Sequence, residues 1–300
     1  MNAKNTLFYK GIDGFTSKNH YELLQMAADS PYRWWFEFLR LSKDYWWLCQ
    51  QKGNTLDPEF KKIWIAFGDV FNVDFANWFI QRGYAIFQQS VAPPTIELLR
   101  SMKIIHEHMR EKNRIVLSVP TDISEKALKK KFVEIIRSVE NRRIRKGDAE
   151  FSLLKVKGVR KHVLEKAHAV WIERFQQSYM QEHQPQIAKK LDMYEIGEKL
   201  SISPSHNRRA GERDKDRILK EKVMRVAVNR MYQRAEALIA NVEFGRFPSY
   251  EKVTISKKRW SKTQQIALAR AVELGEWMPS SKSEIDWRCL ADRYFRNSIW

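Results

Sequence analysis

The sequence has little cysteine and no long hydrophobic run. Its 300 residues include two cysteines, Cys49 and Cys289, which lie far apart and form no Cys-x-x-Cys pair. Cysteines this sparse build neither a disulfide framework nor a metal site, and they favour core positions in a reducing compartment. No stretch of eighteen apolar residues is present, and residues 1–11 lack the apolar run of a signal peptide. We therefore expect a cytoplasmic protein that does not associate with membranes.

Recognisable catalytic motifs are also lacking. The sequence contains no glycine-rich phosphate-binding loop and no nucleophile elbow. His106 and His108 are only two residues apart, so on a helix their imidazoles point to different faces and chelate a metal poorly. Asp148, Glu150 and Lys155 loosely resemble the carboxylate and lysine spacing of metal-dependent nucleases, but no partner acid is evident upstream. The sequence predicts a protein that is not an enzyme and uses no cofactor or metal, with a metal-dependent nuclease as an alternative.

Positive charge is what the sequence has in excess. The formal net charge is +18, from 54 Lys and Arg against 36 Asp and Glu. Residues 1–95 carry ten of the basic and nine of the acidic residues, whereas residues 96–300 carry the other 44 and 27. Such an excess favours a polyanionic partner. We therefore expect the later two-thirds of the chain to bind nucleic acid, with double-stranded DNA as the preferred form.

Helix signals dominate the sequence and are interrupted once, in the middle. Two strand-like segments, residues 114–120 and 150–157, flank an amphipathic helix expected over residues 124–140. The patterns predict a mainly α-helical protein with several domains and a small α+β element. The expected parts are an aromatic-rich helical domain (1–92), the α+β element (95–158), a basic helical domain (159–248) and a small C-terminal helical unit (255–300).

Tryptophan is concentrated near the N-terminus. Six of the eleven tryptophans fall in residues 30–90, where Ser30-Pro31 and Asp57-Pro58 are typical helix starts. We expect these tryptophans to form a core. Adjacent residues on a helix point in different directions, however, so the neighbouring pairs are expected to leave some aromatic surface for a partner. The pairs concerned are Trp34 with Trp35 and Trp46 with Trp47.

A short segment before the basic region has a recognisable pattern. In residues 194–203, Gly197 is a small residue within a short expected helix, and Ile202 is an apolar residue in the turn after it. This segment resembles bacterial helix-turn-helix DNA-binding domains, in which these two positions allow close approach of the recognition helix and anchor it. The sequence departs from that family in its linker, because residues 204–215 are longer than the usual turn.

The basic residues cluster in the linker and in the long helix expected over residues 216–244. The apolar stripe of this helix is expected to have cations on the opposite side of the helix. It is expected to run through Leu219, Val223, Val226 or Ala227, Met231, Ala235, Leu238 and Val242. Arg and Lys suit phosphates and guanine edges, and Asn and Gln can pair with adenine; the alternative is a solvated helix face. The candidate DNA-binding residues are Arg208, Arg209, Arg213, Lys215, Arg217, Lys220, Lys222, Arg225, Asn229 and Gln233.

The C-terminal segment has a second pattern. Trp260 precedes a serine, Gly275 ends an apolar helical stretch, and Trp287 starts the next one. This arrangement resembles a Myb/SANT-type repeat, whose members use a third helix to read DNA. Here the sequence stops at Trp300, which leaves little room for that helix. We therefore expect that the unit can dock a protein instead, with Trp277 and Trp300 as anchors.

The whole pattern is similar to that of uncharacterised proteins of bacterial prophages and integrative elements, on the basis of the aromatic block Trp34–Tyr45 and the basic region after it. This resemblance names no activity. Together with the basic region and the helix-turn-helix-like segment, it leads us to expect a DNA-binding regulator or architectural protein of a mobile genetic element, as a homodimer or with a protein partner bound to its aromatic surface. The alternative is a nucleic-acid-guiding and protein-docking subunit of a phage-defence, replication or transposition complex.

Overall fold

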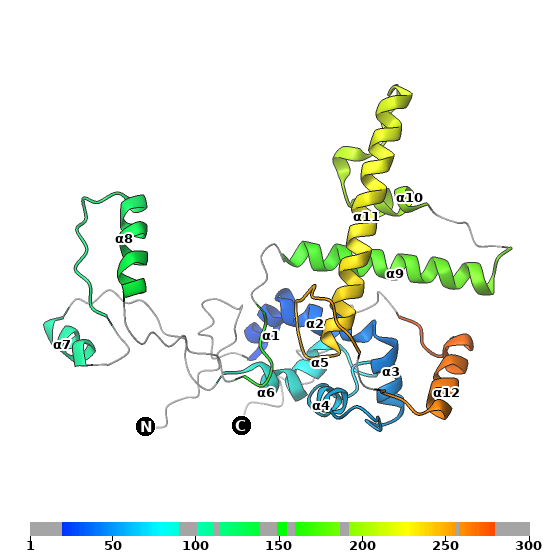
Figure 1. The fold of residues 1–300 in the computed structure, drawn as a ribbon, viewed down its shortest axis with the longest axis horizontal. Helices are drawn as coiled ribbons and strands as arrows, with labels where there is room; N and C mark the ends of the chain where they lie inside the picture. Colours follow the sequence, from blue (N-terminus) through cyan, green and yellow to red (C-terminus); the bar gives the residue numbers. More distant parts are fainter. Residues whose placement is uncertain are drawn as a thin grey trace. The chain divides into compact units, whose positions relative to one another are not determined.

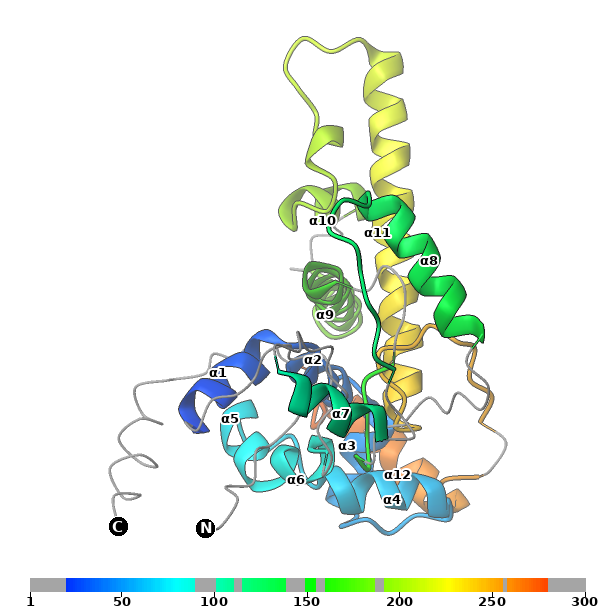
Figure 2. The ribbon, with the colours of Figure 1, turned by 90° about the vertical axis from the view of Figure 1, so that its left-hand side faces the viewer.

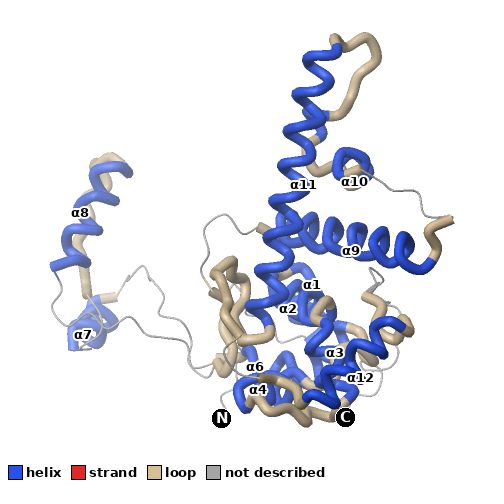
Figure 3. The backbone as a smooth tube through the Cα atoms, turned by 45° about the vertical axis from the view of Figure 1, so that its right-hand side comes forward, coloured by secondary structure: helices blue, strands red, loops and turns tan. Residues whose placement is uncertain are grey.

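The described part of the chain is almost entirely helix and loop. The computed structural model describes residues 20–89, 101–110, 115–138, 149–154, 160–186, 192–255 and 258–279, and these residues contain no strand (Figure 3). The expectation of a mainly α-helical protein is confirmed. The chain forms two compact units, one from residues 1–90 and 149–300 (unit 1) and one from residues 91–148 (unit 2).

Unit 1 holds most of the helices. They are α1 (His20–Asp29), α2 (Pro31–Arg40), α3 (Lys43–Gln50), α4 (Pro58–Phe67), α5 (Phe75–Trp78), a π-helical turn (Phe79–Gly83), α6 (Tyr84–Phe87), α9 (Lys161–His183), α10 (Met193–Lys199), a 3-10 turn (Pro204–His206), α11 (Asp214–Val242) and α12 (Lys262–Glu273). Unit 2 contains α7 (Met102–Arg110) and α8 (Glu125–Ser138). None of the described helices is both long and apolar enough to cross a bilayer.

Local sequence sets several helix starts. The Ser30 hydroxyl accepts a hydrogen bond from the backbone of Tyr32, and Pro31 occupies the first turn of α2, as the sequence predicts. Asp57 caps α4 in the same way, and Gly68 ends that helix with φ +65°. A further cap at Ser42 divides what the sequence indicates as one helix, residues 32–51, into α2 and α3.

A large aromatic cluster forms the core of unit 1. Its centre is Trp35, whose ring lies 5.2–6.0 Å from the rings of Phe67, Phe87, Phe151 and Phe247. These side chains come from α2, α4, α6 and two loops, and the C-terminal half of α11 packs against the same cluster. Each buried ring removes a large apolar area from water, so the aromatic cluster stabilises unit 1.

The expected aromatic surface is not present, which corrects the interpretation of the tryptophan pairs. Trp34, Trp35, Trp46 and Trp47 are all buried, with at most 8% of each residue exposed. The physical reason is that α2 contacts α1, α3, α9 and α11, so it is covered on several sides. Trp35 faces the aromatic cluster while its neighbour Trp34 packs edge-on against His168 of α9.

The predicted α+β element is wrong for the described residues. Residues 115–120 form a loop and no strand, and residues 149–154 belong to unit 1. The backbone N–H of Phe151 donates to Ile86 O at 3.1 Å, and that of Leu154 donates to Phe247 O at 2.8 Å. The segment is therefore held by loops of unit 1, because Phe151 packs against the aromatic cluster there.

A buried ion pair joins three parts of unit 1. The Arg259 guanidinium contacts Glu243 at 2.6 Å and Asp44 at 2.9 Å, and lies over the ring of Phe60 at 4.0 Å. Ser42 donates its hydroxyl proton to Glu243. Burial raises the pKa of the Glu243 carboxyl, whereas Arg259 favours its charged form. The network fixes the C-terminal end of α11 against α3.

The position of α11 separates two environments. α9 crosses α11 near its middle, and the first half of α11 extends past α9, away from α1–α6 (Figures 1 and 2). Beyond this crossing, α11 packs against α10 around a second, smaller apolar cluster. Its buried members are Val170, Tyr194, Ile196, Ile202, Met224 and Val228.

Candidate nucleic-acid interface

Helix α10 is set up by local sequence and by one glycine. Asp192 and Glu195 form a reciprocal capping box at its N-terminus. Gly197 faces α11 so closely that an added Cβ would lie 2.5 Å from the Met224 side chain and 2.9 Å from Val228. Ile202 follows the helix and is buried in the same cluster. Gly197 and Ile202 thus occupy the close-approach and anchoring positions expected from the sequence.

The long linker between α10 and α11 is ordered by contacts with its surroundings. The backbone N–H of Arg208 donates to the Tyr194 hydroxyl at 2.7 Å, and its guanidinium lies 4.3 Å from the centre of that ring. Lys166 of α9 donates to the Ser201 carbonyl oxygen at 2.6 Å. Residues 200–213 are therefore held against α9, α10 and α11.

We call residues 200–230, which comprise this linker and the first half of α11, the basic end. The basic end contains nine Lys and Arg residues and four Asp and Glu residues. Each of its four acids is engaged in an ion pair within the basic end. The pairs are Arg208–Glu221 at 2.9 Å, Arg213–Asp216 at 3.4 Å, Arg217–Asp214 at 3.1 Å, Arg225–Glu221 at 3.5 Å, and Lys220–Glu212.

Asp192 adds a further partner for Arg225. The Arg225 guanidinium donates from Nε to Asp192 Oδ2 at 3.0 Å. This hydrogen bond holds the pKa of the Asp192 carboxyl below its usual value, and the hydrogen bond from Lys220 does the same for the pKa of Glu212. Five of the candidate DNA-binding cations are therefore already paired with neighbouring carboxylates, namely Arg208, Arg213, Arg217, Lys220 and Arg225.

Four cations of the basic end have no carboxylate within ion-pair distance among the described residues. They are Arg209, Lys215, Lys222 and Arg230, and all four are exposed. Lys215, Lys222 and Arg230 are separated by seven and eight residues, about two helical turns each, so they lie along one side of α11. Of these, Arg230 is absent from the sequence-derived set, although the same periodicity places it on this side.

A groove follows the same side of α11. It has a volume of about 560 Å³ and is lined by Ile218, Glu221, Lys222, Arg225, Val226, Asn229 and Arg230. Asn229 and Gln233, both predicted to read bases, are exposed on this side. The arrangement brings cations, an amide and aliphatic side chains together on a helix that projects from unit 1 (Figure 1).

The predicted apolar stripe of α11 is wrong in its first half. Leu219, Val223 and Val226 are exposed, and the buried line there runs through Met224 and Val228 instead. Apolar residues surround this part of the helix on nearly all sides, so periodicity alone does not identify the face that meets α10. In the second half the prediction holds, because Ala235, Leu238 and Val242 are fully buried.

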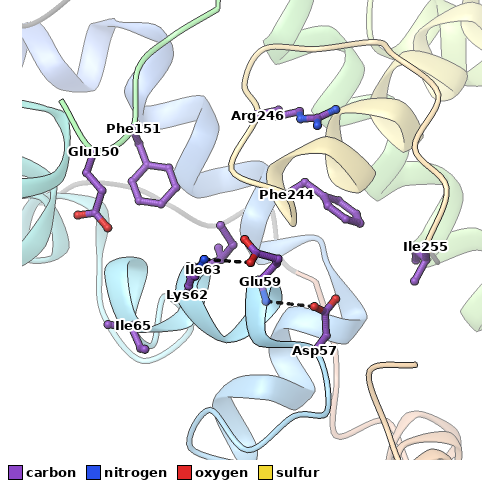
Figure 4. A pocket seen from close by; sticks show the side chains of 10 residues that line it. All are labelled: Asp57, Glu59, Lys62, Ile63, Ile65, Glu150, Phe151, Phe244, Arg246 and Ile255. Carbon is purple, nitrogen blue, oxygen red and sulfur yellow. Dashed lines mark hydrogen bonds and ion pairs between the residues drawn. The ribbon is translucent and has the colours of Figure 1, made fainter. Parts of the chain in front are cut away.

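A second pocket lies near the start of α4 and has a volume of about 550 Å³. Figure 4 shows Glu150 and Phe151 on one side of it, and Asp57 and Glu59 at the start of α4. Asp57 caps the helix, and Glu59 pairs with Lys62 at 2.9 Å. The described residues contain no group of three potential metal ligands, and Asp148 and Lys155 lie outside them. Nothing here supports the nuclease alternative.

The structure describes part of the C-terminal segment, including one of the two tryptophans expected to anchor a protein partner. Trp277 is buried and its ring lies 5.0 Å from that of Phe175 on α9. Trp260 is buried in the aromatic cluster, and Gly275 has φ +73° after α12. Trp287, Trp300 and Cys289 lie outside the described residues. Cys49 is half-buried against the aromatic cluster, and burial raises the pKa of its thiol. Trp277 is therefore a core residue and not an exposed docking anchor.

Comparison with known proteins gave no match: no protein-family model, curated protein or solved structure is similar to this chain.

Proposed function

We propose that this chain binds nucleic acid, with duplex DNA as the preferred form, through the basic end. The observation that carries the proposal is the set of four exposed cations without carboxylate partners among the described residues, Arg209, Lys215, Lys222 and Arg230. A phosphate backbone would neutralise these charges with release of its counterions. The five cations already paired with acids instead hold the basic end in shape.

The packing of α10 on α11 supports the same proposal. Gly197 lets α10 lie close to α11, and the buried side of α11 faces α10 while its opposite side is open. A helix supported from behind and open in front suits insertion into a groove of a duplex. A role as a regulator or architectural protein fits these features. The cytoplasmic location that the sparse cysteines favour would give access to DNA.

The docking-subunit alternative is left without its main support, since the tryptophans expected to bind a partner are buried where the structure describes them. We therefore retain nucleic-acid binding as the function.

Anisotropy titrations with a labelled duplex at several salt concentrations test the proposal. If each of the four unpaired cations contacts one phosphate, affinity should fall by about two decades between 50 and 200 mM salt. Replacing the four unpaired cations by glutamine should reduce the slope of log affinity against log salt by about 0.9 for each phosphate that the variant no longer neutralises.

The matched control replaces four exposed lysines elsewhere on unit 1 by glutamine, namely Lys43, Lys61, Lys252 and Lys262. Both variants have the same net charge, so a general electrostatic effect alters them equally. The salt slopes of the two variants therefore differ only if the four cations interact directly with phosphates. Weak, salt-insensitive binding by the unsubstituted protein, or equal slopes for the two variants, would contradict the proposal.

A further inference from the structure

The outward side of α11 carries an aliphatic patch that the cations alone do not explain. Ile218 is 62% exposed, Leu219 61%, Val226 43% and Val223 36%. A group of large aliphatic side chains left in water on one helix face is typical of an interaction surface. We call these four residues the aliphatic patch.

Cations lie among the residues of the aliphatic patch, and their charge limits the class of molecule that can bind there. Lys215, Lys222 and Arg230 lie on the same side of the helix, before, within and after the aliphatic patch. The acids of the basic end are already paired within it, so a second copy would bring unpaired like charges face to face. A polyanion that also offers apolar groups fits better.

Among nucleic acids, the major groove of B-form DNA has this chemistry. It is about 12 Å wide, admits an α-helix, is bordered by phosphates, and presents the 5-methyl group of thymine as an apolar contact. The major groove of duplex RNA is deep and narrow, and uracil lacks the methyl group. The part of α11 from residue 214 to 230 is about 24 Å long at 1.5 Å per residue, which is long enough to lie in such a groove.

An amide accompanies the aliphatic patch. Asn229 is three residues from Val226 and lines the same groove. An asparagine amide can pair bidentately with adenine N6 and N7, on the same base pair that presents a thymine methyl. The aliphatic and amide groups therefore select the same kind of base pair.

We infer that the outward side of α11 recognises A·T-rich DNA by packing the aliphatic patch against thymine methyl groups in the major groove. This inference rests on the proposed function and adds the class of sequence and the type of duplex that is bound. The cations position the helix on the phosphates, and the aliphatic patch with Asn229 reads the base pairs.

The experiment compares two short duplexes of identical A·T-rich sequence, one with thymine and one with deoxyuridine in place of every thymine. The substitution removes only the methyl groups and leaves charge and base pairing unchanged. Removal of two or more methyl groups that the protein buries should weaken binding about tenfold, with the same salt slope for both duplexes.

The variant Leu219→Ser, Val223→Ser, Val226→Ser should bind the two duplexes equally and keep the salt slope, because no charge is altered. The control Ile65→Ser, Ile266→Ser, Leu274→Ser removes three exposed aliphatic side chains on other parts of unit 1 and should keep the preference for thymine. Thermal unfolding of both variants checks that each is folded.

Equal binding of the two duplexes by the unsubstituted protein, with a steep salt slope, would overturn the inference and leave the proposed function intact. Weak, salt-insensitive binding to both duplexes would contradict the inference and the proposed function alike. Sedimentation gives the remaining outcome. If the unsubstituted protein is a dimer and the triple serine variant a monomer without any change in the thymine preference, the aliphatic patch binds a second copy and the inference fails.

Discussion

The two ends of α11 lie in different surroundings although they belong to one uninterrupted helix. At its C-terminal end, Ala235, Leu238 and Val242 are fully buried against the aromatic cluster, and Glu243 is enclosed with Arg259. At its N-terminal end, α11 has one buried line against α10 and is open on the opposite side. The C-terminal end of α11, which we call the aromatic end, is fixed by many ring contacts and a buried ion pair. The basic end depends on the second, smaller apolar cluster and on ion pairs that are at least partly exposed.

This contrast explains how one unit can combine a stable core with a charged surface. The aromatic cluster packs against the C-terminal half of α11 and so fixes the helix whose other half projects. The basic end is then able to keep cations and aliphatic side chains exposed, at a local cost in stability. Three measurements would break or sharpen the comparison.

The largest effect is expected at the buried ion pair of the aromatic end. Arg259→Met would leave Glu243 buried without its counter-charge and should lower the free energy of unfolding by about 3–5 kcal/mol. Arg208→Met, which removes the exposed pair with Glu221 at the basic end, should lower it by about 1 kcal/mol or less. Urea unfolding of both variants measures the difference. Equal decreases in the two variants would show that the two ends contribute alike.

The free energy of unfolding is expected to depend on pH through His168, a residue of α9 that packs against Trp34 and Phe38 of α2. Burial, with smaller contributions from Arg40 and Arg33, lowers the pKa of His168 to about 3 from its ordinary 6.5. The unfolded chain therefore binds a proton between these values that the folded protein does not. The stability contributed by the neutral imidazole is present above pH 6.5 and is lost as pH falls, by about 1.4 kcal/mol for each pH unit.

Urea unfolding at several pH values between 7.5 and 5 tests this, with His168→Leu as the control. The variant should lose less stability than the unsubstituted protein over this range. If both lose the same amount, His168 is not the group responsible, and the coupling between α2 and α9 is insensitive to pH.

An effect confined to one part of unit 1 is expected at the basic end. Gly197→Val would force a side chain into Met224 and Val228 and should destabilise the packing of α10 on α11 by about 1–3 kcal/mol. Hydrogen exchange should quicken in α10 and the first half of α11 while amides of α2 stay protected. Glu198→Val, at the next and exposed position, is the matched control and should change exchange little. Faster exchange throughout unit 1 in the glycine variant would mean that the two ends unfold together.

Much of the helical architecture could be predicted because its signals are local. The caps at Ser30, Asp57 and Asp192 are short-range patterns of side chain and backbone, and they act independently of what packs around them. The close-approach role of Gly197 could also be predicted, since only glycine leaves such space within a short helix. The excess of positive charge in the later part of the chain is a property of composition alone.

Other features depended on neighbours distant in the sequence. Adjacent tryptophans were expected to expose one ring, but α2 is enclosed by four helices, so both Trp34 and Trp35 are buried. The segment around Phe151 was expected to form a strand, yet it packs into the aromatic cluster without a strand partner.

By itself the sequence determined the helices, their caps and the basic character of the later chain, because these follow from bonding within a few residues and from composition. Only the tertiary structure decided which face of α11 meets α10 and which cations lack a carboxylate. Burial and ion pairing depend on what lies opposite a side chain, and Arg225 and Arg230, five residues apart on one helix, differ for that reason: Asp192 lies beside one and no acid pairs with the other among the described residues.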